Sequence, residues 1–144
     1  MLSNTCKYAL RAVIYLSANA GDTTKIGIKK IGEDLDIPTP FLGKILQVLA
    51  RNKILSSTKG PHGGFGIGKD PDKISVMEIV NIIDGADSFN ICVIGLKQCK
   101  EQGVPCILHD KYAHLREEMK SSFEKQSIGD LVKDIKDGKQ KLLI

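Results

Sequence analysis

The turn sequence KGPHGG at residues 59–64 constrains the fold of this chain most, because it separates two short runs typical of β-strands. The runs cover residues 54–58 and 65–68 and predict a β-hairpin. Two helical patterns, at residues 28–35 and 39–52, precede the hairpin with a tight turn between them. Two helices joined by a tight turn and followed by a hairpin predict a winged helix-turn-helix.

Further helical patterns surround this unit and predict a chain that is mainly α-helical with a small β-hairpin. Apolar positions recur at helical spacing after the cap-forming Ser3, and again in a helix that opens with Ser75 and Glu78 as a capping box. A long helix with one apolar face follows Pro105, and a short helix lies near the end of the chain. Such a long apolar face needs a partner, either the first helix or its own copy in a homodimer.

We therefore divide the chain into three parts. They are a winged helix-turn-helix DNA-binding domain (1–84), a cysteine-rich loop (85–105), and a dimerisation helix with a C-terminal short helix (106–144). A chain of 144 residues is long enough to bury a core of its own.

The second helix of the predicted helix-turn-helix has an apolar side and a polar side. Its apolar residues form one stripe that we expect to face inward: Phe41, Leu42, Ile45, Leu46 and Leu49. In a winged helix-turn-helix this helix enters the DNA major groove, where exposed polar side chains meet base edges and phosphates. The glycine-rich hairpin tip can approach the DNA backbone closely. The candidate DNA-binding residues are Thr39, Lys44, Gln47, Arg51, Lys59 and His62, with Lys7 a weaker one.

Charge is distributed unevenly along the chain. Residues 1–73 hold 11 Lys and Arg against 6 Asp and Glu, a net charge of +5, whereas residues 74–144 have a net charge of −1. This asymmetry favours an anionic partner such as double-stranded DNA. The chain is 42% hydrophobic but has no apolar run that could span a membrane, so we expect no membrane partner. Its first residues are polar and helix-like rather than a secretory signal, which predicts a cytoplasmic protein.

Three of the four cysteines lie within residues 92–106, and a histidine follows three residues later. In a reducing cytoplasm such a group predicts metal or redox chemistry rather than disulfides. We expect Cys92 and Cys99 on a loop, Cys106 in the first turn of the long helix, and His109 one turn later on the same face. Three thiolates and one imidazole can complete a tetrahedral zinc site or bind an iron–sulfur cluster. The candidate metal ligands are Cys92, Cys99, Cys106 and His109.

Two patterns that suggest enzymes lack essential parts. Residues 63–69 have the glycine and lysine spacing of a phosphate-binding loop, but Asp70 and Pro71 follow where a Ser or Thr at the start of a helix is required. Cys106 and His109 could form a nucleophile and base, but no third group or oxyanion site stands at a recognisable spacing. We predict that the chain is not an enzyme and has no catalytic residues.

The chain resembles the IscR/NsrR/CymR-type winged-helix regulators of bacteria, the Rrf2 family. The resemblance rests on residues 2–12 (LSNTCKYALRA), residues 59–65 (KGPHGGF), residues 75–80 (SVMEIV) and the three cysteines. It implies a homodimeric transcription regulator whose long helices cross at the dimer interface. It also implies an iron–sulfur cluster in each subunit, with 2Fe-2S favoured over 4Fe-4S here, although other members of the family lack a cluster.

The resemblance extends to the individual ligands. The residues that match the family's cluster ligands are Cys92, Cys99, Cys106 and, for the IscR-type site, His109. NsrR-like members instead use a carboxylate from the partner subunit, and Lys7 stands at that position here, where a cation cannot ligate. The adjacent Cys6 is an alternative fourth ligand, but it can equally be a packed thiol on the first helix.

We therefore predict a DNA-binding transcription regulator, a repressor, whose operator affinity follows an iron–sulfur cluster that responds to redox, nitric oxide or iron–sulfur status. Pro38-Thr39-Pro40 stands where IscR has Ser-x-Ser, and Gly43 stands where IscR has a glutamate, so the operator is expected to differ from that of IscR. Two alternatives stay open. One is a winged-helix regulator with a zinc or metal-free thiol site, and the less favoured one is an iron–sulfur electron carrier, which would need no recognition helix.

Overall fold

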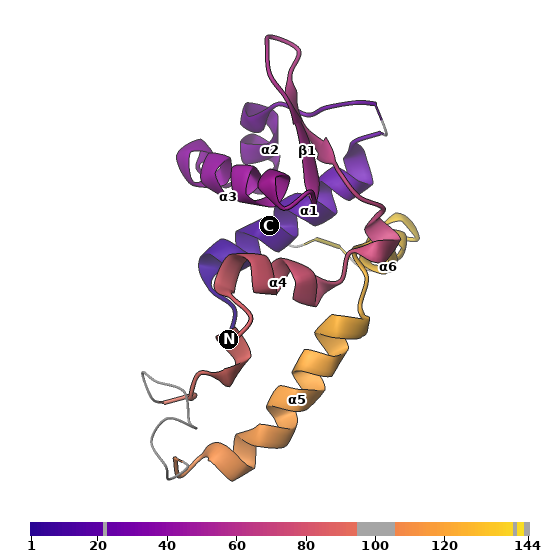
Figure 1. Cartoon of the computed structure of the whole chain (residues 1–144). Helices are drawn as coiled ribbons and strands as arrows, with labels where there is room; N and C mark the ends of the chain where they lie inside the picture. Colours follow the sequence, from indigo (N-terminus) through magenta and orange to yellow (C-terminus); the bar gives the residue numbers. More distant parts are fainter. Residues whose placement is uncertain (22, 95–105, 140, 143–144) are drawn as a thin grey trace.

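The computed structural model describes residues 1–21, 23–94, 106–139 and 141–142, which form a helical body with a projecting hairpin and a long outlying helix (Figure 1). In chain order the elements are α1 (Asn4–Asn19), α2 (Ile28–Leu35), α3 (Thr39–Arg51), β1 (Leu55–Thr58), β2 (Gly64–Ile67), η1 (Pro71–Lys73), α4 (Val76–Asp84), η2 (Ser88–Asn90), α5 (His109–Lys125) and α6 (Ile128–Lys136). These helices and the two-stranded antiparallel sheet confirm the predicted mainly α-helical class with a small hairpin.

Helix α1 lies at the centre of the body, and α3, α4 and α6 pack against it. Its buried residues recur at helical spacing, as predicted: Cys6, Ala9, Ala12, Val13, Ile14 and Leu16. The predicted cap Ser3 accepts a hydrogen bond from the Cys6 N–H at 3.0 Å and donates its own N–H to Asp84 Oδ2 at 2.9 Å. Asp84 is the last residue of α4, so its carboxylate joins the end of α4 to the start of α1. A carboxylate at a helix N-terminus also interacts favourably with the helix dipole.

Serine caps fix the first turns of α4 and α6. Ser75 accepts a hydrogen bond from the Glu78 N–H, and Ser127 accepts one from the Asp130 N–H, both at 3.0 Å. The two serines face each other in an antiparallel bridge, which places the starts of the two helices side by side. The Glu78 carboxylate binds the Lys69 ammonium at 2.7 Å, whereas in a reciprocal capping box it would accept the N–H of the capping serine.

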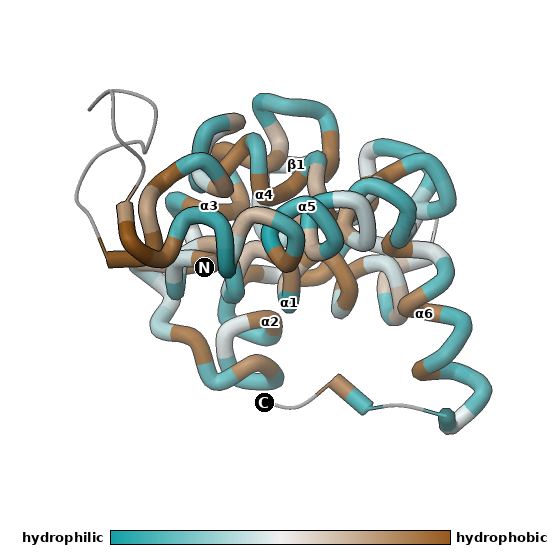
Figure 2. Tube along the Cα trace, turned by 90° about the horizontal axis from the view of Figure 1, so that it is seen from below, coloured by the Kyte–Doolittle hydropathy of each residue, from teal (hydrophilic) through white to brown (hydrophobic). Residues whose placement is uncertain are grey.

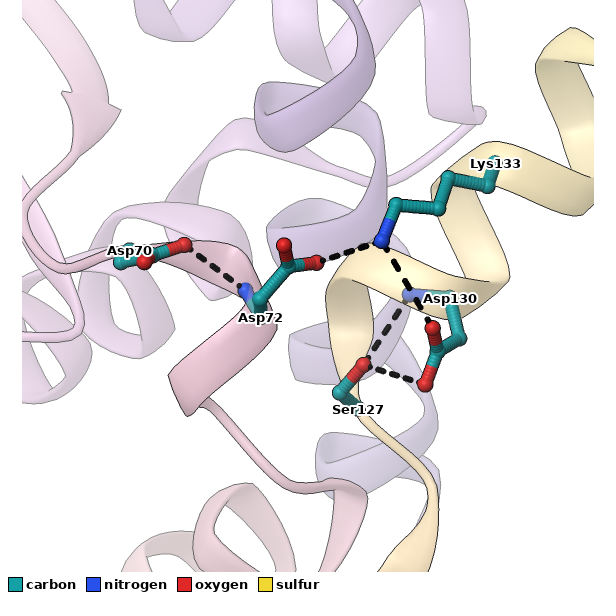
Figure 3. A network of polar contacts seen from close by, with 5 residues as sticks. All are labelled: Asp70, Asp72, Ser127, Asp130 and Lys133. Atoms are coloured by element: carbon teal, nitrogen blue, oxygen red, sulfur yellow. Dashed lines mark hydrogen bonds and ion pairs between the residues drawn. The ribbon is translucent and has the colours of Figure 1, made fainter.

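A polar network connects η1 with α6 at the surface (Figure 3). Lys133 Nζ lies 3.2 Å from Asp72 Oδ1, and the Asp72 carboxylate raises the pKa of Lys133. Gly129 permits this approach, because a Cβ at that position would overlap the Asp72 carboxylate. Ion pairs this exposed are screened by water and salt, so we attribute the placement of α6 mainly to the fully buried Ile74 and Ile128.

Helix α5 contacts the body through one part of its length and leaves the other part outside (Figure 1). Met119 and Phe123 pack against the core, whereas Tyr112 and Leu115 are 41% and 49% exposed. Phe89 of η2 meets Phe123 edge-on, with ring centroids 5.8 Å apart. No helix among the described residues is long and apolar enough to span a membrane.

Candidate DNA interface and cysteine site

A tight turn between α2 and α3 sets the relative position of these helices. Asp36 ends α2 in the left-handed conformation, at φ 52°, and the Ile37 N–H then donates to the Gly32 carbonyl at 3.0 Å. Gly32 makes this closure possible, because a Cβ there would lie only 2.9 Å from the Ile37 carbonyl oxygen. The local sequence therefore produces the predicted helix-turn-helix.

Helix α3 presents its polar side to solvent. Its buried residues are Leu42, Ile45, Leu46 and Leu49. The predicted DNA-binding residues on this helix, Thr39, Lys44, Gln47 and Arg51, are all exposed. One expectation was wrong: Phe41, which was assigned to the inward stripe, is 66% exposed. Helical spacing places it at the border between the apolar and polar sides, and the packing of α3 leaves that border outside the core.

The hairpin β1–β2, which we call the wing, projects from the end of the molecule opposite α5 (Figure 1). Its strands pair from Leu55 opposite Ile67 to Thr58 opposite Gly64. The Gly63 N–H closes the tip by donating to the Gly60 carbonyl at 3.0 Å, and a Cβ at Gly63 would overlap the Thr58 carbonyl.

The wing carries the two remaining DNA-binding candidates at its tip. Lys59 and His62 are both exposed there. Near the tip end of β2, Phe65 exchanges two backbone hydrogen bonds of 2.9 Å with Ile26, which joins the hairpin to the segment before α2. The wing is therefore attached to the same unit that holds the helix-turn-helix.

The structure brings two of the four predicted metal ligands into contact. Cys92 Sγ lies 3.3 Å from Cys106 Sγ, although the two residues are 14 positions apart. Cys92 is 8% exposed and Cys106 is partly exposed. Cys99 lies outside the described residues. Within the described ranges, no three His, Cys, Asp or Glu side chains gather as a set of metal ligands.

His109 stands at the start of α5 rather than one turn into it. The helix begins at His109. Cys106 precedes it in a turn, and the Cys106 carbonyl accepts a hydrogen bond from the His109 N–H at 2.9 Å. The expectation that Cys106 lies in the first helical turn was therefore wrong. The His109 Nδ1 atom is buried and has no hydrogen-bond partner among the described residues. A ring nitrogen without a partner is available to ligate, so the donor chemistry fits a metal centre.

Cys6 is placed differently from the other described cysteines. It lies on α1, is 0% exposed, and belongs to the hydrophobic core. Burial raises the pKa of its thiol to about 12, and the Asp84 carboxylate adds to this by charge repulsion and by accepting a hydrogen bond. A thiol with so high a pKa stays protonated at neutral pH, so this environment favours a packed thiol over a metal ligand.

An apolar hollow of about 430 Å³ lies beside the cysteine pair, between η2, the segment after it and α5. Its lining includes Phe89, Cys92, Tyr112, Leu115 and Met119. The exposed hydrophobic residues that line it are Met1, Ile91, Val93, Tyr112 and Leu115, and Ile94 and Ile107, next to Val93 and Cys106 in the sequence, are exposed as well. Figure 2 shows the hydrophobic segments on either side of residues 95–105. An apolar surface of this kind marks an interaction site.

Related proteins are regulators of transcription. A family model described as Rrf2, iron-dependent transcriptional regulator, matches residues 2–134. An HTH-type transcriptional regulator of Aquifex aeolicus (strain VF5) is 34% identical over 133 residues, which cover 92% of this chain and 91% of that protein. The HTH-type transcriptional regulator IscR of Klebsiella pneumoniae (strain 342) is 28% identical over 131 residues, which cover 91% of this chain and 78% of IscR.

Solved structures share the fold. CymR (YrzC), the global cysteine regulator of B. subtilis, superposes with a TM-score of 0.74 at 20% identity, covering 92% of this chain and 96% of CymR. The IscR of T. potens superposes with a TM-score of 0.72 at 16% identity, covering 99% of this chain and 93% of that one. These likenesses confirm the predicted winged-helix architecture.

Proposed function

We infer that this chain, which belongs to the Rrf2 family of transcriptional regulators, represses transcription by binding operator DNA with an affinity that an iron–sulfur cluster controls. The family consists of transcription regulators and not of enzymes, and its members bind DNA. The single observation that carries the proposal is that two features occupy different parts of the molecule. The exposed residues of α3 and the wing lie at one end, and the cysteine pair lies beside α5. Because operators lie on the chromosome, this function places the chain in the cytoplasm.

The proposed DNA contacts divide into base readers and backbone binders. On α3, Lys44 and Gln47 reach base edges in the major groove, where Lys prefers guanine and Gln prefers adenine. Arg51 near the end of α3, together with Lys59 and His62 on the wing, binds phosphates and so fixes the register of the protein on DNA. The Thr39 hydroxyl, on the first turn of α3, is the remaining proposed contact with DNA.

The proposed cluster ligands are Cys92, Cys99, Cys106 and His109. The 3.3 Å contact between Cys92 and Cys106 and the unpartnered His109 Nδ1 support this set. An iron–sulfur cluster, 2Fe-2S or 4Fe-4S, would supply a centre whose ligation changes with oxidants, nitric oxide or iron–sulfur supply. Cys92 follows η2 and Cys106 precedes α5, so ligation of both thiols by one cluster would fix the position of α5 relative to the body.

A homodimer completes the proposal. The exposed Tyr112 and Leu115 and the adjoining 430 Å³ hollow form an apolar surface that a second copy of α5 would cover. Two copies would then carry two α3 helices at a spacing set by the α5 pair. In this arrangement residues 1–84 bind DNA, and residues 85–105 form the cluster-binding loop, whose cysteines act together with Cys106 and His109. Residues 106–144 supply the dimer helix and the short helix α6.

The same thiol pair supports a second candidate. Two sulfur atoms 3.3 Å apart suit zinc as well as iron, and they also suit a metal-free thiol sensor. Metal content and colour separate these cases. An electron carrier is the least favoured function, because the family regulates transcription.

The test is an ultraviolet-visible spectrum with iron and sulfide analysis of protein purified without oxygen. We expect broad absorption between roughly 320 and 500 nm in the wild type, lost in Cys106→Ala, altered in His109→Ala and unchanged in the matched control Cys6→Ala. Selection of genomic DNA fragments by the same protein then tests operator binding. A colourless protein that still selects specific DNA would leave the zinc or thiol regulator, and failure to select any DNA would overturn the regulator proposal.

A further inference from the structure

Phe41 is an exposed aromatic side chain at the DNA end of the molecule. It is 66% exposed on the first turn of α3, while the neighbouring Leu42 is fully buried. Of the other large hydrophobic residues that the described ranges leave exposed, Met1, Ile91, Val93, Tyr112 and Leu115 line the hollow beside the cysteine pair, and Ile94 and Ile107 follow Val93 and Cys106 in the sequence. Helix α3, which carries Phe41, lies at the other end of the molecule from the free end of α5 (Figure 1), so the apolar surface that we assign to dimerisation does not account for the exposure of Phe41.

The position of Phe41 on α3 follows from the packing of α3 against α2. On one flank of the exposed side, Gly43 faces α2, since a Cβ there would lie 3.3 Å from Ile28 Cδ1. With about 3.6 residues per turn, Phe41 falls on the other flank, away from α2 and one turn before Lys44. Phe41 therefore borders the face of α3 that carries the proposed base readers, Lys44 and Gln47.

The first turn of α3 has few groups that can hydrogen-bond to bases. Pro40 and Gly43 carry no donor or acceptor in their side chains, which leaves the Thr39 hydroxyl as the hydrogen-bonding side-chain group among these residues. In the major groove the apolar feature is the C5-methyl group of thymine, which aromatic and aliphatic side chains contact.

We propose that Phe41 contacts the C5-methyl group of a thymine in the major groove and so determines operator sequence at that base pair. This inference rests on the proposed function, because it requires that α3 enters the groove. Free in water, the exposed ring gives the fold little stabilisation, whereas covering it with a thymine methyl removes apolar surface of both groups from water. Removing one buried methyl group corresponds to a loss of about fourfold in affinity.

The experiment compares thymine with uracil, which differs only by lacking the methyl group. A duplex site is first selected from a random library with the full-length wild-type protein, and each thymine in it is then replaced singly by uracil. Affinities are measured by fluorescence anisotropy for the wild type, for Phe41→Ala, and for the control Lys44→Ala. The exposure of Phe41 means that Phe41→Ala folds normally, which thermal unfolding verifies.

We expect wild type to bind about fourfold more weakly when one particular thymine becomes uracil, and Phe41→Ala to bind both duplexes equally. Lys44→Ala should bind more weakly but keep the wild-type ratio between the two duplexes. Two results would overturn the inference and leave the regulator proposal intact. One is a ratio of thymine to uracil affinities in Phe41→Ala equal to that of the wild type, and the other is no effect of uracil at any position of a selected site. If no site is selected, the proposed function itself fails, and the inference with it.

Discussion

Cys6 should resist alkylation in the native protein far more than it does in the unfolded chain. The structure raises the pKa of its thiol from 9.0 to about 12, with burial as the first cause and Asp84 as the second. Alkylating reagents react with the thiolate, and below both pKa values the thiolate fraction falls tenfold for each unit of pKa, about 1,000-fold here. A more basic thiolate is a better nucleophile, which offsets about 30-fold of this loss. The remaining factor of about 30 combines with steric protection of a side chain that is 0% exposed.

The assay is pulsed alkylation with iodoacetamide at about pH 8, followed by mass spectrometry of the peptide that contains Cys6. The reference is the same peptide labelled in protein unfolded by guanidinium chloride. We expect native labelling to be at least about 100-fold slower, and to keep rising between pH 9 and 12 where the unfolded rate has levelled off. The partly exposed Cys106 serves as a comparison within the same protein freed of metal.

Asp84→Asn isolates the smaller cause of the shift. Because burial is the leading cause, this variant should raise the native labelling rate by less than about tenfold. Native Cys6 labelling within tenfold of the unfolded rate would refute the reasoning. It would show an accessible thiol and restore Cys6 as a candidate for the fourth ligand.

Three further predictions concern the wing, α2 and the aromatic contact with α5. Gly63→Ala should weaken operator binding at least about tenfold in an anisotropy titration, because its Cβ overlaps the Thr58 carbonyl, whereas the control Gly27→Ala, which meets nothing within 4 Å, should not. Asp34→Asn should lower the melting temperature at neutral pH. This difference should shrink as the pH falls, because hydrogen bonds from Lys30 and Tyr15 lower the pKa of Asp34 below 3.8, and the stabilisation is lost as the pH drops through the lowered value. A double-mutant cycle of Phe89→Ala and Phe123→Ala in urea unfolding should give a coupling of about 0.5–1.5 kcal/mol, and additive effects would contradict the edge-on contact.

Local signals predicted most of the element boundaries. Ser3 and Ser75, the caps expected from the sequence, cap α1 and α4, and in both cases the side-chain oxygen accepts the N–H three residues ahead. Ser127, which was not assigned as a cap, does the same for α6. Gly63 and Gly64 of the wing tip likewise mark positions where a Cβ would overlap the backbone, of Thr58 and of Ile26 respectively, whereas Gly60 adopts a positive φ of 105°. Apart from the approach of Gly64 to Ile26, such features depend on neighbours in the sequence, so the sequence contains what is needed to predict them.

Tertiary packing explains what the sequence did not predict. Hydrophobicity placed Phe41 in the core, but which flank of α3 the core covers depends on the angle at which α2 and α1 pack on it. Glu78 was expected to complete a capping box, yet the distant Lys69 ammonium binds its carboxylate. The apolar face of α5 was recognised, but not that Phe123 packs on its own chain while Leu115 stays outside.

The connections around Asp84 indicate how a change at the cysteine site would reach the end that carries α3 and the wing. Asp84 ends α4, binds Ser3 at the start of α1, and is followed by the segment that carries Phe89 and Cys92. A shift of that segment would thus act on the orientation of α5 relative to α1, and α1 packs directly against α3. Helix α3 also packs directly against α2 and β1, so we expect the internal geometry of α2, α3 and the wing to stay unchanged.

Cluster state should therefore alter the distance between the two α3 helices of the proposed dimer rather than the bases that each α3 reads. The measurement is binding of cluster-loaded and metal-free protein to operators that share identical half-sites but differ in spacer length by one or two base pairs. We expect the two forms to prefer different spacers and to tolerate the same half-site substitutions, because half-site separation follows dimer geometry. If cluster loss instead changed half-site preference at constant spacing, the signal would have to enter α3 itself, and the route through Asp84 and α1 would be wrong.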